Sequence, residues 1–432
     1  MSSFLLPTLK PGAKEKLDKL LVGTVESRNF PAISFGATNA KETIYFNQAG
    51  EVVFGDSSSG QVDEESITEI FSQTKFITCL AALQLVDKKL VSLDNEADIE
   101  KYLPEIAKIP LLKGYDSDGK AILEKPKNKV TLRMLMSHSA GFVYPRDDSI
   151  LTQYLKANPV LDMFDPKATV DALSSPLIYE PGTSFRYSVS IDWVGIMVER
   201  VSGLNLERYF RQNIFGPVGA ESFTFYPTPE VRRRKIAACE RDAQGKVQVI
   251  PGGFGMGRPQ EPEQVGLLLG GAGLYGTQKD YLAVLRAVLR CDPRYSDRPS
   301  KPLISPESYA EMFKPCLPRG QGYTGCDVLF AMVNPSKYLD NPMPENVNHS
   351  VAFLINQEPL RGRRKANSGC WSGAAKTQFW IDPESGIAVS SEAQTKRSRG
   401  QAICGTHLLG PSPDPWFATY TAYETELYAG LK

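Results

Sequence analysis

The sequence has no excess of charge of either sign. Its 432 residues contain 49 Lys and Arg together and 49 Asp and Glu together, so the formal net charge at pH 7 is zero. The basic clusters are short, such as Arg232 to Arg234 and Arg361 to Lys365, and are typical of solvated surface. Nucleic acids and anionic membranes attract proteins through extended positive charge. We therefore expect neither of them as a partner.

The sequence also lacks long hydrophobic runs and paired cysteines. The N-terminal segment contains no apolar stretch as long as that of a signal peptide or a transmembrane helix. The seven cysteines are dispersed and form no C-x-x-C pair. This pattern is typical of reduced thiols in an intracellular protein rather than of a disulfide framework. Together, these absences predict a cytoplasmic protein.

Histidine is scarce, and we predict no metal site. The three histidines, His138, His349 and His407, do not stand at metal-site spacing from one another or from other ligands. A glycine-rich stretch, Gly271-Ala-Gly-Leu-Tyr-Gly276, has the spacing of a dinucleotide fingerprint. That fingerprint also requires a surrounding βαβ unit, which the sequence does not display. A tight structural loop is therefore the favoured interpretation, and no cofactor is predicted.

Apolar periodicity indicates strands at the two ends of the chain and helices between them. Strand patterns cover Ala32 to Thr38, Thr43 to Asn47, Thr377 to Ile381 and Ile387 to Ser391. A Gly/Ser-rich loop is expected from Gly55 to Gly60. The pattern is mostly helical from about residue 70 to about residue 290.

This order predicts an α/β (α+β) fold. Its simplest form is an antiparallel sheet flanked by helices, built from both chain ends, with an inserted, mostly helical lobe. A chain of this length usually forms more than one lobe. We expect a discontinuous sheet lobe of residues 1–68 and 300–432 and a helical lobe of residues 69–299. The active site should lie between them.

The most informative segment is Phe71-Ser-Gln-Thr-Lys75 with the helix that follows it. Apolar residues surround this helix, so we expect it to be buried on nearly all sides. Ser72 then lies at the N-terminus of a buried helix, where backbone N–H groups and the helix dipole favour developing negative charge. Lys75 follows Ser72 by one helical turn and therefore lies on the same face of the helix. A desolvated lysine can act as a base near neutral pH, so a nucleophile, a base and one oxyanion donor fall within four residues.

The pattern S-x-x-K is weak evidence by itself. Ser117-Asp-Gly-Lys120 matches it as well, in a stretch that is typical of an exposed turn. For Ser72, the alternative is an N-cap serine followed by a lysine that faces solvent. The apolar residues around the helix favour the catalytic interpretation because they leave Lys75 little solvent to reach.

Two further segments fit the same chemistry. Tyr187 lies in a loop before a helical pattern, and its phenol can both donate and accept a proton; a packing tyrosine is the alternative. Near the C-terminus, Cys370-Trp-Ser-Gly-Ala374-Ala leads into a strand. Small residues there let a substrate approach the backbone closely, and an N–H group of this segment could be a second oxyanion donor.

Together, these segments resemble the serine β-lactamase and penicillin-binding-protein superfamily. The class C β-lactamases and their esterase relatives are the nearer branch, and the fungal acyltransferase (transesterase) group of statin biosynthesis is nearer still. The last resemblance runs along nearly the whole chain, through ordered segments that include Leu103-Pro104, Gly114 to Asp116, Thr131 to Gly141, Glu180 to Gly182, Asp192-Trp193, Gly270 to Gly273 and Trp380 to Pro383. It implies that His138 is a structural residue at a helix end.

The resemblance implies catalysis through an acyl-enzyme. Ser72 would attack an ester or thioester carbonyl, and Lys75 and Tyr187 would move its proton. Backbone N–H groups of Ser72 and Ala374 would form the oxyanion hole. The acyl-Ser72 intermediate would then pass its acyl group to an alcohol or to water.

The chain departs from the β-lactamase pattern at four positions predicted to form the substrate pocket. Val189 stands where the tyrosine motif of β-lactamases ends in Asn, and Trp371, Ser372 and Gly373 stand where their strand motif reads Lys-Thr-Gly. The missing amide and ammonium groups would have held the amide and carboxylate of a β-lactam. Val189 and Trp371 offer an apolar, aromatic wall instead, so we expect neither antibiotic resistance nor cell-wall peptidase activity.

The predicted function is that of a serine acyltransferase in specialised metabolism. Its donor would be an ester, or a thioester on an acyl carrier protein or coenzyme A, and its acceptor an alcohol of a small molecule. An intracellular esterase or thioesterase is the alternative, because both reactions share the acyl-enzyme. A catalytically silent binding protein is a third, which the intact set of Ser72, Lys75 and Tyr187 disfavours.

Overall fold

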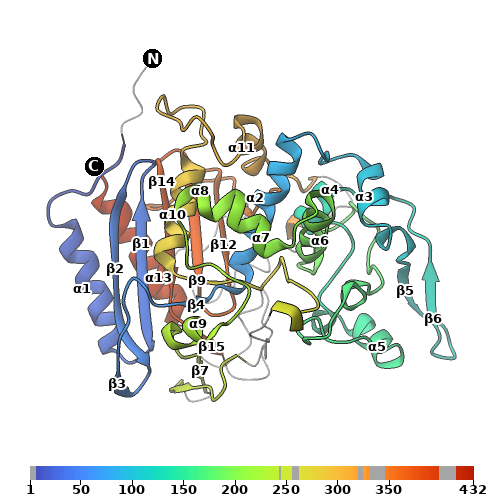
Figure 1. The fold of residues 1–432 in the computed structure, drawn as a ribbon, viewed down its shortest axis with the longest axis horizontal. Helices are drawn as coiled ribbons and strands as arrows, with labels where there is room; N and C mark the ends of the chain where they lie inside the picture. The colour runs from blue at the N-terminus through green and yellow to red at the C-terminus, as the bar shows by residue number, and fades with distance from the viewer. Residues whose placement is uncertain are drawn as a thin grey trace.

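One antiparallel sheet joins the two ends of the chain in the computed structural model, which describes residues 6–242, 245–254, 262–319, 325–327, 329, 346–397 and 415–432 (Figure 1). The sheet has eight strands, in the order β10 (Val347–His349), β11 (Leu354–Asn356), β12 (Ser368–Ser372), β13 (Gln378–Asp382), β14 (Ile387–Glu392), β1 (Ala32–Thr38), β2 (Thr43–Val53) and β3 (Asp56–Gln61). The N-terminal and C-terminal strands meet where β1 pairs with β14, with Phe35 opposite Ser391.

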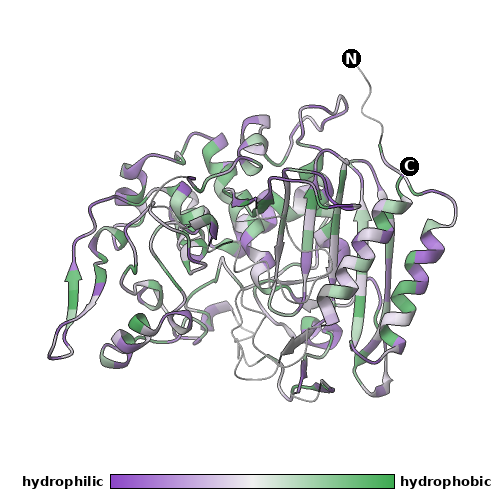
Figure 2. Ribbon diagram, turned by 180° about the vertical axis from the view of Figure 1, so that it is seen from behind, coloured by the Kyte–Doolittle hydropathy of each residue, from purple (hydrophilic) through white to green (hydrophobic). Residues whose placement is uncertain are grey.

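Helices cover both faces of this sheet. On one face, α1 (Ala13–Glu26) packs against α13 (Pro415–Gly430), and Tyr423 of α13 stacks on Phe35 with 4.4 Å between ring centroids. On the other face, α10 (Gln278–Leu289) packs on β14 and β1. Hydrophobic and hydrophilic residues alternate along α1 (Figure 2), as expected for a helix with one buried face.

The described part of the chain between β3 and β10 has more helices than strands. Its central helix, α2 (Thr74–Asp87), packs against α6 (Ser190–Ser202) and buries every residue from Thr74 to Leu85. The other helices are α3 (Glu96–Tyr102), α4 (Leu132–Met136), α5 (Ser149–Ala157), α7 (Leu206–Phe210), α8 (Gly216–Val218), α9 (Pro229–Arg234) and α11 (Pro306–Met312). Short strands pair as β4 (Thr68–Glu69) with β9 (Tyr275–Gly276), β5 (Leu111–Tyr115) with β6 (Ala121–Glu124), and β7 (Cys239–Arg241) with β8 (Val247–Val249) and β15 (Thr395–Arg397). The predicted fold class is confirmed, and the lobe boundaries at residues 68 and 300 stay a prediction.

One predicted loop is wrong. The Gly/Ser-rich stretch from Gly55 to Gly60 lies almost wholly in strand β3, which pairs with β2 at the edge of the sheet. Most residues of β3 are exposed, so no apolar alternation marks the strand in the sequence. Backbone pairing with the long strand β2, in which Glu51 stands opposite Gln61, outweighs the low strand propensity of glycine and serine.

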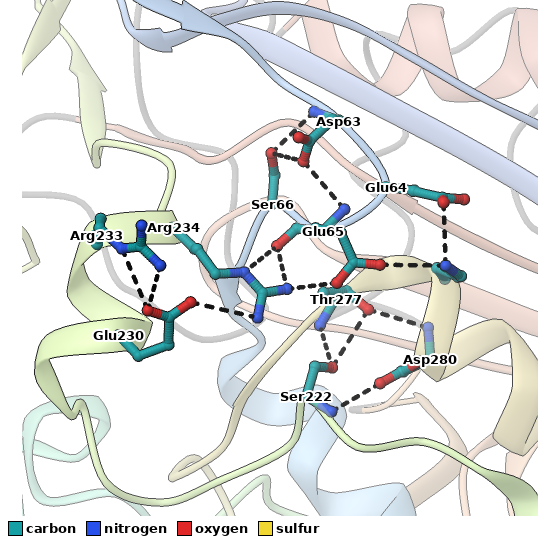
Figure 3. Close-up of polar contacts among 11 residues, drawn as sticks. Asp63, Glu64, Glu65, Ser66, Ser222, Glu230, Arg233, Arg234, Thr277 and Asp280 are labelled. Atoms are coloured by element: carbon teal, nitrogen blue, oxygen red, sulfur yellow. Dashed lines mark hydrogen bonds and ion pairs between the residues drawn. The ribbon is translucent and has the colours of Figure 1, made fainter.

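Surface ion pairs fix the segment that leads from the sheet towards β4. Arg234 of α9 contacts Glu65 at 2.8 Å, and Lys279 of α10 contacts both Glu64 and Glu65 at 3.2 Å (Figure 3). Exposed pairs of this kind contribute at most about 1 kcal/mol each to stability. Their effect here is to hold residues 63–66 against two helices, just before the chain enters β4 and the site described below.

Glu424 gives a prediction for stability. Its carboxylate contacts the guanidinium groups of Arg363 at 3.1 Å and Arg364 at 2.8 Å, and none of the three side chains is more than 4% exposed. Glu424→Ala removes the carboxylate from two buried cations. We expect it to lower the free energy of unfolding by about 3–5 kcal/mol, measured by urea unfolding.

The matched control is Glu426→Ala, on the same helix. The ion pair of Glu426 with Lys16 spans 3.4 Å, and the two side chains are 31% and 68% exposed. Its loss should lower the free energy of unfolding by no more than about 1 kcal/mol. Equal losses of unfolding free energy in the two variants would contradict a larger contribution from the buried cluster of Glu424, Arg363 and Arg364.

Candidate active site

Ser72 lies in a strained turn between β4 and α2. The turn is the 3₁₀ segment η1 (Phe71–Gln73), and α2 follows it directly. Phe71 has a φ of 45°, in the left-handed region, which costs a non-glycine residue about 1–2 kcal/mol. Its ring packs edge-on against Phe254, with 5.2 Å between ring centroids. The turn places the half-buried Ser72 at the N-terminal end of a buried helix, as the sequence predicts.

Lys75 is buried, and its side-chain nitrogen reaches Ser72. The residue is 3% exposed. Its Nζ donates to Ser72 Oγ at 3.3 Å, to the Tyr144 hydroxyl at 3.2 Å and to the Gly271 carbonyl oxygen at 2.7 Å. The ring of Tyr187 faces the same nitrogen, with 4.6 Å from Nζ to the ring centroid. The structure therefore brings Ser72, Lys75 and Tyr187 together and adds Tyr144 to them.

Sequence analysis does not identify Tyr144. It is buried just before the short turn at 145–147, and its ring centroid lies 5.4 Å from that of Tyr187. It follows shortly after the block from Thr131 to Gly141 that carries the family resemblance. No local pattern distinguishes it among 18 tyrosines, because its partner Lys75 is 69 residues away in the chain.

The glycine-rich loop at 270–276 holds Lys75 from the opposite side. The Gly270 carbonyl oxygen accepts a hydrogen bond from Thr78 at 2.7 Å, and the Gly271 N–H donates to Asp192 Oδ1 at 2.8 Å. A Cβ atom at Gly271 would lie 2.6 Å from Asp192 Oδ2, so a side chain here would displace the Asp192 carboxylate. The stretch acts as a tight structural loop, as predicted, and it carries the carbonyl oxygen that accepts from Lys75.

The turn after β12 packs beside the Ser72 segment. A Cβ atom at Gly373 would lie 2.4 Å from the Ile70 carbonyl oxygen, so the two backbones are in close contact. Thr377 donates to the same oxygen at 3.1 Å. Ala374 lies within this turn and Ser372 at the end of β12, and both are half-buried. The contact brings the backbone of the turn to η1, and the oxyanion role of Ala374 stays a prediction.

Trp371 belongs to an aromatic cluster around Tyr187. Its ring centroid lies 5.2 Å from that of Tyr187, 5.4 Å from His349 and 6.4 Å from His138. Burial lowers the pKa of His349 to about 4 and lowers the pKa of His138 well below its ordinary value. Both imidazoles are therefore uncharged near neutral pH, and this side of the site is aromatic and neutral. His138 comes just after Ser137, the C-cap of α4, and has a φ of 57°, which fits the predicted place at a helix end.

Among the described residues, the remaining sequence candidates make no ring contact or hydrogen bond with this cluster. Val189 is buried in the apolar core at the start of α6, and its part in a substrate wall stays a prediction. Ser117 and Lys120 lie in the exposed turn between β5 and β6, as expected for the second S-x-x-K match. His407 lies outside the described residues.

Two features do not occur in the part of the chain that the structure describes. There, no three His, Cys, Asp or Glu side chains are grouped so that they could hold a metal ion. The described helices also include none with the length and apolar character needed to span a bilayer.

Comparisons with known proteins identify the family of this chain. The β-lactamase family model matches residues 17–400. The chain belongs to the β-lactamase family. Acyltransferase calJ of Penicillium decumbens is 29% identical over 333 residues, which cover 75% of each chain. Monacolin J acid methylbutanoyltransferase of Aspergillus terreus is 28% identical over 328 residues, or 74% of each chain.

A hydrolase of the family and a solved structure are also similar. Lovastatin esterase of Penicillium rubens is 28% identical over 362 residues, covering 81% of this chain and 85% of the relative. Unliganded simvastatin synthase of Aspergillus terreus shares the fold, with a TM-score of 0.78 at 22% identity, covering 97% of this chain and 99% of that chain. The predicted resemblance is confirmed, and the chain is an enzyme of the acyltransferase and hydrolase branch of the β-lactamase family.

The depressed pKa of His349 gives a prediction for stability against pH. The unfolded chain binds a proton at this residue near pH 6.5, whereas the folded protein does so only near pH 4. The stability that neutral His349 provides is therefore complete above pH 6.5 and is lost as the pH falls towards 4. We expect the difference in unfolding free energy between wild type and His349→Gln to shrink by about 1.4 kcal/mol per pH unit in this window.

The measurement is urea unfolding of both proteins at pH 8, 7, 6 and 5. Above pH 7 the difference between them should be constant, which serves as the internal control. A difference that stays constant down to pH 5 would contradict a buried, neutral imidazole in the folded protein.

Proposed function

We propose that this enzyme is a serine acyltransferase that moves an acyl group from an ester or thioester to an alcohol of a small specialised metabolite. The observation that carries the proposal is the 3.3 Å hydrogen bond from buried Lys75 to Ser72 at the start of α2. Two of the similar proteins are named as acyltransferases, which supports a transferase over a β-lactamase. The missing amide at Val189 and the missing ammonium at Trp371 support the same choice.

In the proposed acylation step, Ser72 Oγ attacks the carbonyl carbon of the donor. Its proton passes to the Lys75 nitrogen in the neutral amine form, whose two N–H groups donate to Tyr144 and Gly271 and whose lone pair accepts from Ser72. Backbone N–H groups of Ser72 and Ala374 stabilise the oxyanion. The tetrahedral intermediate then collapses: the bond to the thiol or alcohol breaks, the leaving group takes a proton, and acyl-Ser72 remains.

The two tyrosines have different roles in this proposal. Tyr187 relays the proton between the serine–lysine pair and the leaving group, and later between the acceptor alcohol and that pair. Tyr144 fixes the Lys75 nitrogen through its hydroxyl, 3.2 Å away. We assign these different roles because the two contacts with Lys75 differ. The Lys75 nitrogen faces the ring of Tyr187, whereas it donates a hydrogen bond to the hydroxyl oxygen of Tyr144.

The neutral aromatic side of the site favours discharge by an organic alcohol. Trp371, His138 and His349 present uncharged rings next to Tyr187, and such a wall excludes water better than charged groups do. The donor would be a thioester on an acyl carrier protein or coenzyme A, or a simple ester. A second candidate is an esterase, since lovastatin esterase matches a larger share of the chain than the two acyltransferases do.

Product analysis tests the proposal. Purified protein is incubated with a short-chain acyl thioester, with and without candidate alcohols, and the acylated alcohol and free acid are quantified. We expect acylated alcohol to exceed free acid, and Ser72→Ala to abolish both products. The matched control is Ser117→Ala, in the exposed second S-x-x-K, which should leave the rates unchanged. Free acid as the sole product with every alcohol would favour the esterase instead.

The roles of the tyrosines predict unequal losses. Tyr187→Phe keeps the ring that faces Lys75 but removes the proton relay, so kcat/KM should fall by about 10²–10⁴-fold. Tyr144→Phe removes one hydrogen bond of about 1 kcal/mol and should lower kcat/KM roughly fivefold. Both are measured with an activated ester. Full activity in Tyr187→Phe, combined with a large loss in Tyr144→Phe, would reverse the assignment.

A further inference from the structure

A buried carboxylate lies two hydrogen bonds away from Lys75. Asp192 of α6 is 1% exposed, and its Oδ1 accepts a hydrogen bond from the Gly271 N–H at 2.8 Å. The carbonyl oxygen of the same glycine accepts from Lys75 Nζ at 2.7 Å. A single residue, Gly271, therefore connects the carboxylate to the side-chain nitrogen of Lys75.

Tight packing leaves this connection little freedom. A Cβ atom at Gly270 would lie 3.0 Å from the Ile191 carbonyl oxygen, and one at Gly195 would lie 3.3 Å from the Gly270 Cα atom. On the other side, the Thr78 hydroxyl donates to the Gly270 carbonyl oxygen at 2.7 Å. The loop at 270–276 therefore packs between helices α2 and α6. This packing fixes the Gly271 carbonyl oxygen at hydrogen-bond distance from Lys75 Nζ.

The charge of Asp192 is close enough to act on Lys75. An amino acid spans about 3.6 Å at most from its N atom to its O atom. With the two hydrogen bonds, the Asp192 oxygen and Lys75 Nζ are thus at most about 9 Å apart. At an effective dielectric constant of about 20, unit charges at that distance move a titration midpoint by about one pH unit.

We propose that Asp192 is a positioning residue of the acyl-transfer reaction: it aims the Gly271 carbonyl group at Lys75, and its negative charge favours the protonated form of that lysine. The inference rests on the base role proposed for Lys75. Asp192 touches neither Ser72 nor the reacting carbonyl in this scheme; it acts on Lys75 through its hydrogen bond to Gly271 and through its charge. The charge of Asp192 thereby stabilises Lys75 after it has accepted the proton that Ser72 releases.

Other titratable groups near Lys75 do not replace this effect. Burial raises the pKa of the Cys79 thiol on α2 to about 12, and burial lowers the pKa of His138 well below its ordinary value, so neither carries a charge near neutral pH. Tyr144 and Tyr187 face the lysine with their hydroxyl and ring. The helices packed on α6 carry charges in ion pairs of their own, namely Arg133–Asp94 at α4, Lys129–Glu100 at α3 and Arg211–Glu207 at α7.

Asp192→Asn separates charge from geometry. The amide oxygen of asparagine can still accept the Gly271 N–H, but the negative charge is gone. The probe is p-nitrophenyl butyrate, and kcat/KM of the full-length protein is followed from pH 5 to 9. Without the anion Lys75 loses its proton more readily, so we expect the acid-limb midpoint to move down by about one pH unit. A purely structural role would leave that midpoint in place.

Two more variants complete the test. Asp192→Ala also removes the hydrogen bond to Gly271, and we expect kcat to fall by about 10–100-fold with little change in KM. Asp87→Asn is the control, because Asp87 lies at the far end of α2, where it accepts hydrogen bonds from Ser305 and Ser308. We expect its acid limb to match that of the wild type.

The outcomes separate this inference from the function on which it rests. An acid-limb midpoint in Asp192→Asn equal to that of the wild type overturns the role of Asp192, even if the variant is less stable. A wild-type rate no higher than that of Ser72→Ala overturns the proposed function and this inference with it.

Discussion

Burying a lysine nitrogen is unfavourable unless hydrogen-bond partners replace the water it loses. Here the nitrogen is that of Lys75. It donates to Ser72 one turn back and to two groups far along the chain, the Tyr144 hydroxyl after α4 and the Gly271 carbonyl oxygen in a glycine loop. The rest of the site follows from this requirement. Helix α2 must be enclosed on all sides, the loop must approach it without side chains, and Ser72 becomes the hydroxyl that the lysine can reach.

The Ser72 segment is held from two directions. The Ile70 N–H donates to the Leu274 carbonyl oxygen at 3.1 Å, and the Ile70 carbonyl oxygen accepts from Thr377 at 3.1 Å. One bond comes from the glycine loop and the other from the turn after β12. Such support from both sides explains how the left-handed backbone of Phe71 persists in spite of its strain. Sheet and helices thus meet at Ile70, two residues before Ser72.

Local patterns in the sequence predict much of this arrangement, and contacts between distant segments account for what they miss. The all-round apolar character of α2 predicts its burial, and the spacing of Ser72 and Lys75 predicts their contact. Tyr144 and Asp192 are missed as members of the site because each joins Lys75 only through the packing of separate elements. Strand β3 is missed because its residues are exposed and pair through the backbone. The motif predicts Val189 as a pocket residue, and this stays a prediction, because the burial of Val189 in the core depends on how α6 packs.

The central claim is that Ser72 carries the acyl group. Intact-protein mass spectrometry, after brief mixing with a short-chain acyl thioester, measures this directly when wild type and Ser72→Ala are compared. The account predicts a mass increase of one acyl group on the wild type alone, located on the peptide that contains Ser72, and its loss on addition of an acceptor alcohol. An equal increase on Ser72→Ala, or an acyl group located on another peptide, would contradict it.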